Sequence, residues 1–101
     1  MKIIINASDR YRLAALLEVA WVHPAALATA EIARRRDIPA AYLAQLLRDL
    51  RRDGLIVSRR GPGGGIALAR HPSEVRLGDV LLADLPAGDD QDVVGRLEGL
   101  L

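Results

Sequence analysis

The segment from Ala40 to Asp53 constrains the fold more than any other part of the chain. On a helix of about 3.6 residues per turn, its leucines share one side: Leu43, Leu46, Leu47 and Leu50. The opposite side carries Ala41, Gln45, Arg48 and Arg52. Pro39 suits the start of such a helix and Gly54 is typical of its end. We therefore predict a helix that buries its leucines and exposes a polar face.

Two strand-like runs follow this helix, Leu55–Arg59 and Ile66–Ala69. Between them, residues 60–65 read Arg-Gly-Pro-Gly-Gly-Gly. Hairpin tips need positive φ angles, which glycine adopts without strain. Three consecutive glycines also let the backbone approach a partner closely. The pattern predicts a hairpin whose glycine tip follows two arginines.

The N-terminal part of the chain predicts two further helices. The first has an apolar stripe of Leu13, Leu16, Leu17, Ala20 and Trp21. We expect Ser8 or Asp9 to cap it, Trp21 to lie in the core, and His23-Pro24 to end it. A short second helix is expected from a Thr29 cap to the basic triplet at 34–36. That triplet has a structural explanation, because cations are favoured at a helix C-terminus, and a functional one, because it can contact phosphates.

The C-terminal part is expected to contain short elements. A helix is predicted over 78–83, followed by a linker. A last helix over about 90–101 would have an apolar face of Val93, Val94, Leu97, Leu100 and Leu101. We expect residues 1–83 to form one domain and 84–101 to form a linker and a short C-terminal helix.

Composition and charge exclude several classes of protein. The 101 residues include no cysteine, which excludes disulfides, a thiol nucleophile and an all-thiolate iron–sulfur cluster. No apolar run approaches the ~20 residues that span a bilayer, and the N-terminal apolar stretch is too short for a signal peptide. The expected location is therefore the cytoplasm, without membrane contact. Residues 1–76 have a net charge of +6 and residues 77–101 of −5, which favours a polyanion partner for the basic part.

The order of helix, short helix, tight turn, amphipathic helix and hairpin is the winged helix-turn-helix plan. We predict an α+β fold, mostly α, with a two-stranded wing and a short C-terminal helix. In this plan a helix enters the major groove of DNA while the hairpin reaches the neighbouring minor groove or backbone. Gln45 suits adenine, whereas Arg48 and Arg52 suit phosphate or guanine. Tyr42, at the edge of the polar stripe, can donate its hydroxyl to a phosphate.

Three runs, Ile38–Leu47, Leu50–Ile56 and Ser58–Gly65, resemble the IscR-type (Rrf) family of bacterial winged-helix regulators. Flanking pieces extend this resemblance over roughly residues 8–83. The resemblance implies a homodimeric DNA-binding transcription factor, usually a repressor, whose helix at 40–53 reads the major groove. It also implies that Arg60 enters the minor groove, and that Tyr42 and Gln45 occupy conserved helix positions.

The sequence also departs from this family. Sensing members carry three cysteines after the segment that corresponds to 78–83, and these hold an iron–sulfur cluster. Residues 83–92 contain none, and His23 and His71 follow no ligand spacing, so we expect no cofactor and no metal. The long dimerisation helix looks shortened to about 90–101. Ala41 and Ala44 stand where relatives often have Ser and Glu, although alanine still contacts a thymine methyl.

Two functions stay open. The first is a sequence-specific DNA-binding repressor that acts as a homodimer on duplex DNA. The second is a protein–protein interaction module on a winged-helix scaffold with weak or no DNA binding. An enzyme is not expected, because no acid–base or nucleophilic constellation is present and the glycine run lacks the Lys-Ser/Thr of a phosphate loop. The predicted DNA-binding residues are Ala41, Tyr42, Gln45, Arg48, Arg52, Arg59, Arg60, Gly61, Gly63 and Gly64.

Overall fold

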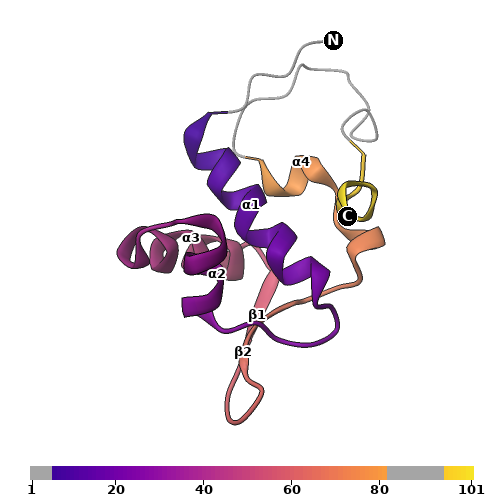
Figure 1. Cartoon of the computed structure of the whole chain (residues 1–101). Helices are drawn as coiled ribbons and strands as arrows, with labels where there is room; N and C mark the ends of the chain where they lie inside the picture. The colour runs from indigo at the N-terminus through magenta and orange to yellow at the C-terminus, as the bar shows by residue number, and fades with distance from the viewer. Residues whose placement is uncertain (1–5, 82–94) are drawn as a thin grey trace.

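The computed structural model describes residues 6–81 and 95–101 (Figure 1). In chain order the elements are α1 (Ala7–Trp21), α2 (Thr29–Arg36), α3 (Ala40–Arg52), β1 (Ile56–Arg59), β2 (Gly65–Leu68), the 3-10 turn η1 (Pro72–Glu74), α4 (Leu77–Val80) and the 3-10 turn η3 (Leu97–Leu100). Helix, short helix, helix and hairpin thus follow one another as predicted. The two-stranded antiparallel sheet is the predicted wing.

Helix α1 lies at the centre of the fold and contacts α2, α3, α4, β2 and η3 (Figure 1). Its residues Leu16 and Val19 are fully buried, as are Ile32 of α2 and Leu43 and Leu50 of α3. Burying an aliphatic side chain of this size contributes about 1.5–3 kcal/mol. A single core therefore holds α3 against the body of the protein.

The predicted apolar stripe of α1 is wrong in part. Leu13 and Leu17 are only half-buried, and Trp21 is 62% exposed rather than in the core. Leu16 and Ala20 of the predicted stripe are buried, and Ala15, which was not part of it, is buried with them. Because α1 has neighbours on several sides, small residues are buried at its close contacts, and side-chain size alone does not identify the buried face.

The start of α1 and the start of α2 also differ from expectation. Asn6 caps α1, because its side-chain oxygen accepts a hydrogen bond of 2.8 Å from the backbone N–H of Asp9. Ala28 is the N-cap of α2 and makes no side-chain capping bond, so Thr29 is the first helical residue. The helix still ends in the basic triplet, and Asp37 follows it with a left-handed φ of 51°.

The basic triplet of α2 forms ion pairs with two glutamates. Arg34 and Arg35 bond Glu31 of the same helix, and Arg35 and Arg36 contact Glu18 of α1. The two arginines lower the pKa of Glu31 from 4.5 to about 2 through side-chain hydrogen bonds, with that to Arg34 the larger cause. This charge network ties α2 to α1.

Strands β1 and β2 pair along their whole length, from the residue pair Ile56 and Leu68 to the pair Arg59 and Gly65 next to the tip. Leu27, in the loop before α2, extends the hairpin through two 2.8 Å backbone hydrogen bonds with Ile66. This bridge was not predicted from the sequence. A Cβ atom on Gly65 would lie 2.4 Å from the carbonyl oxygen of Leu27, so the close approach requires glycine.

The C-terminal residues pack back onto the domain, but not as an α-helix of eleven or so residues. Residues 95–101 contain the single turn η3, preceded by a bridge between Arg76 and Arg96. Gly95 has a φ of 77°, which an α-helix does not accommodate. Leu97 is fully buried, whereas Leu100 and Leu101 are exposed.

Helix α4 covers 77–80 rather than the expected 78–83. The remaining part of the expected last helix (90–94, with Val93 and Val94) and the expected domain boundary at 83/84 lie outside the described residues. Within 6–81 and 95–101, no helix is long and apolar enough to cross a membrane.

Candidate nucleic-acid interface

The outer face of α3 is the first part of the candidate interface. Its four leucines are buried, and the opposite face exposes Ala41, Gln45, Arg48 and Arg52. The predicted division of this helix into an apolar and a polar side is therefore confirmed. An exposed helix face of this kind is available to a groove of DNA.

The arginines of α3 differ in their partners. The Arg52 guanidinium lies 3.3 Å from a carboxylate oxygen of Asp49 and 3.5 Å from one of Asp53. Arg48 makes no ion pair with any residue that the structure describes. Arg51, which was not among the predicted site residues, is exposed and lines a surface hollow together with Arg48, Asp49 and Arg52. Its position three residues after Arg48 is the signal that could have found it.

Tyr42 occupies the edge of this face and is half-buried. Its ring packs edge-on against Tyr11 of α1, with 5.3 Å between ring centroids and an angle of 89° between planes. Such aromatic pairs contribute about 0.5–1.5 kcal/mol beyond buried area. Tyr42 therefore connects the start of α3 to α1 in addition to any contact with a ligand.

The wing is the second part of the interface, and it projects from the body beyond α2, away from both chain ends (Figure 1). The Arg59 side chain donates a 2.7 Å hydrogen bond to the carbonyl oxygen of Pro24, so it ties the hairpin to the loop after α1. Arg60 is exposed and has no ion-pair partner within the described ranges. Of the two arginines, Arg59 is anchored through one of its guanidinium N–H groups, whereas Arg60 has no such anchor among the described residues.

The glycines of the tip have structural reasons of their own. Gly61 and Gly63 have φ angles of 86° and 74°. At Gly64 a Cβ atom would lie 2.4 Å from the carbonyl oxygen of Arg59. The backbone N–H of Gly64 donates a 2.9 Å bond to the carbonyl oxygen of Gly61, which closes the turn. The tip is thus a tight turn in which Pro62 carries the one side chain among residues 61–65.

A buried arginine on α1 supports α3 from behind. Arg12 is fully buried and donates from Nε to the carbonyl oxygen of Val80 and from Nη2 to Asp53, at 2.8 and 3.0 Å. It joins α1 to the ends of α3 and α4. Sequence reasoning missed this residue, because Arg12 stands beside the apolar stripe and arginine is rarely buried.

Comparison with protein families matches residues 5–84 to the Rrf2 family, described as iron-dependent transcriptional regulators. The chain is 37% identical over 82 residues to the HTH-type transcriptional regulator IscR of Cereibacter sphaeroides, covering 78% of this chain and 53% of that protein. It is 40% identical over 80 residues to IscR of Serratia proteamaculans, covering 78% and 49%. The chain thus spans about half the length of the curated relatives it matches.

Solved structures agree with these matches. The structure of CymR, the global cysteine regulator of B. subtilis, aligns with a TM-score of 0.78 and 27% identity over 98% of this chain and 96% of that one. T. potens IscR aligns with a TM-score of 0.80 and 26% identity over 99% and 87%. The predicted winged-helix fold is confirmed, and the matched family is one of regulators rather than enzymes.

The residues that the structure describes do not fit the iron dependence in the family description. An iron–sulfur cluster on thiolate ligands needs cysteines, and the sequence contains none. Among the described residues no group of three or more His, Asp or Glu side chains could hold a metal ion. The described residues therefore lack the donor set for such a group.

Proposed function

This chain belongs to the Rrf2 family of transcriptional regulators, and from that premise we propose that it binds duplex DNA as a homodimer and represses transcription. The observation that carries the proposal is the exposed face of α3, which is backed by buried leucines and bears Gln45 and the arginines. A helix fits the major groove, where base edges are distinguishable.

Five residues of α3 have a role in this proposal. Gln45 pairs with a base edge, adenine by preference, and Ala41 contacts a thymine methyl. Arg48 and Arg52 bind phosphates or guanine, and Tyr42 donates its hydroxyl to a phosphate. Two carboxylates partly neutralise the charge of Arg52, whereas Arg48 forms no ion pair among the described residues, so Arg48 contributes more to affinity.

In the wing, Arg60 enters the minor groove, where a narrow groove concentrates negative potential. Arg59 holds the hairpin in position and adds positive charge near the DNA. Gly61, Gly63 and Gly64 let the tip lie close to the sugar–phosphate backbone, since these three positions carry no side chain and the only ring among them is that of Pro62.

Two-fold symmetry of a homodimer sets the spacing of the target. Half-sites would lie about one helical turn apart, or about 34–36 Å. We further propose that residues 1–83 form the DNA-binding domain, that 84–101 form a linker and dimerisation tail, and that the protein acts in the cytoplasm without an iron–sulfur cluster.

The exposure of Trp21, with Leu100 and Leu101 also exposed, favours a second candidate. Single exposed apolar residues are common, but three from the end of α1 and the C-terminus suit a protein contact. In this alternative the chain is a protein-interaction module with weak or no DNA binding.

Footprinting on genomic fragments, including the sequence upstream of the gene for this protein, distinguishes the DNA-binding repressor from the interaction module. The proposal predicts a protected region with two symmetric halves. It also predicts two protein chains per DNA site, which sedimentation of the complex would measure. No protection at micromolar protein would contradict the proposal and favour the interaction module.

A further inference from the structure

A second cationic site lies outside the candidate interface, between α1 and the end of α2. It is a pocket of about 310 Å³ lined by Ala7, Arg10, Tyr11, Ala14 and Arg36. The volume is at the lower limit of sites that hold small ligands. Two guanidinium groups and a phenol are its polar groups, and the alanines leave room between them.

The two arginines of this pocket differ in their ion pairs. Arg10 is exposed and forms no ion pair inside the described ranges. The Arg36 guanidinium is oriented by Glu18, whose carboxylate oxygen accepts from it at 2.8 Å. Glu18 also lies 3.5 Å from Arg35, which in turn bonds Glu31 together with Arg34, so two glutamates face three arginines and one positive charge is left uncompensated. A pocket with one free and one oriented guanidinium suits a phosphoryl group.

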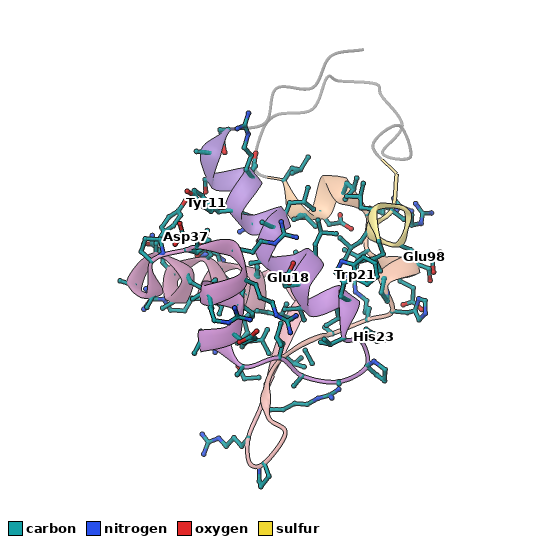
Figure 2. The ribbon with its side chains drawn as sticks, viewed as in Figure 1. Tyr11, Glu18, Trp21, His23, Asp37 and Glu98 are labelled. Carbon is teal, nitrogen blue, oxygen red and sulfur yellow. The ribbon has the colours of Figure 1, made fainter. Side chains whose placement is uncertain are left out.

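The location of the pocket connects it to α3. Tyr11 lines it and packs against Tyr42, near the start of α3. Figure 2 shows Tyr11 on the same side of the molecule as Asp37, which precedes α3 and does not line the pocket. In helix-turn-helix proteins the recognition helix contacts base edges with its N-terminal residues. The pocket therefore lies beside the end of α3 that is nearest the groove.

We propose that Arg10, Tyr11 and Arg36 bind a phosphate of the DNA backbone next to the groove occupied by α3. This inference rests on the proposed DNA-binding function and adds a contact from α1 to it. The bound phosphate bridges α1 and α2, and the contact between Tyr11 and Tyr42 fixes the start of α3 relative to that phosphate. The site reads backbone position rather than base sequence.

Arg10→Gln tests the proposal by fluorescence anisotropy with the full chain and its footprinted duplex. We expect affinity to fall about tenfold near 0.1 M salt. The slope of log affinity against log salt should fall by about 0.9, the value for one phosphate contact. Arg70→Gln, which changes the charge equally at an exposed arginine outside the pocket, should leave both quantities near wild type.

Methylphosphonate substitution locates the contacted phosphate. One neutral linkage next to the half-site should weaken the wild type but not Arg10→Gln, and Tyr11→Phe should weaken binding less than Arg10→Gln. If Arg10→Gln binds every duplex as the wild type does, the proposal is overturned. If the wild type itself binds no duplex, the proposed function is refuted instead.

A free anion is the alternative source of the phosphoryl group. Titration with inorganic phosphate, followed by amide NMR shifts around Arg10 and Tyr11, addresses it. Saturable shifts at millimolar phosphate, combined with unchanged DNA binding by Arg10→Gln, would overturn the assignment to the backbone. No saturable shifts, combined with the reduced salt slope, would support it.

Discussion

The guanidinium of Arg12 lies 3.0 Å from the carboxylate of Asp53, and this pair joins the centre of α1 to the C-cap of α3. The Arg12 side chain is fully buried, whereas that of Asp53 is 32% exposed. Removing one partner of such a pair leaves a charge without compensation in the interior. The orientation of the proposed recognition helix therefore depends on a residue that does not reach the DNA.

Asp53→Asn should destabilise the protein, because it removes the carboxylate that faces the buried Arg12. We expect a loss of about 2–3 kcal/mol in the free energy of unfolding, given the partial exposure of Asp53. Urea unfolding measures it. Asp49→Asn is the matched control, since Asp49 pairs only with the exposed Arg52 among the described residues, and it should cost under about 1 kcal/mol. Equal losses in the two variants would contradict this role of Arg12.

Gly65→Ala should destabilise the wing. Its φ of 136° is unfavourable for alanine, and the added Cβ would meet the carbonyl oxygen of Leu27 at 2.4 Å. We expect about 1–3 kcal/mol from the strained backbone, together with weaker DNA binding. Gly99→Ala, where a Cβ meets nothing within 4 Å, serves as the control. Thermal unfolding of both variants decides whether the bridge between Leu27 and Ile66 is needed.

The two wing arginines should respond differently to the target sequence. Arg60→Ala is expected to weaken binding most where A-tracts narrow the minor groove beside the half-site. Arg59→Ala breaks the bond to Pro24 and loosens the hairpin, so it should weaken binding to narrow and wide grooves alike. Anisotropy with two duplexes that differ only in the flanking tract measures this. The same sequence preference in both variants would argue against separate roles.

Stability should fall in acid through Glu31. Its pKa is lowered from 4.5 to about 2 by Arg34 and Arg35, so the folded state favours the ionised carboxylate. The contribution is therefore complete above pH 4.5 and is lost as the pH falls towards 2. Glu31→Gln should show a smaller drop in thermal midpoint across this window than the wild type. Parallel pH profiles would show that the network with Glu31 adds no stability.

Local sequence patterns made much of the fold predictable. The leucine stripe of α3 and the glycine tip of the hairpin each follow from local periodicity and φ requirements, and both occur where expected. The buried face of α1 was not predictable in this way, because Arg12 is buried through partners 41 and 68 residues away in sequence. The same holds for Leu27, whose bridge to Ile66 is a tertiary contact without a local signal.

For the candidate site, the residue types were predictable but their partners were not. The polar stripe placed Gln45, Arg48 and Arg52 on the exposed face, where they lie. The hydrogen bond from Arg59 to Pro24 and the ring contact between Tyr42 and Tyr11 depend on how loops and helices meet. The apolar spacing of 90–101 suggested a helix, but the left-handed Gly95 and the bridge to Arg76 form a different structure at 95–101.

The salt dependence of duplex binding tests the central claim most directly. Anisotropy titrations of the wild type and of Arg48→Gln would cover salt concentrations from about 50 to about 200 mM, where the effect of phosphate contacts on affinity is large. The α3 face predicts a steep wild-type decline and a slope smaller by about 0.9 in Arg48→Gln, with affinity reduced for every sequence tested. A wild-type affinity that does not change with salt, or identical slopes for the two proteins, would contradict the placement of α3 on DNA.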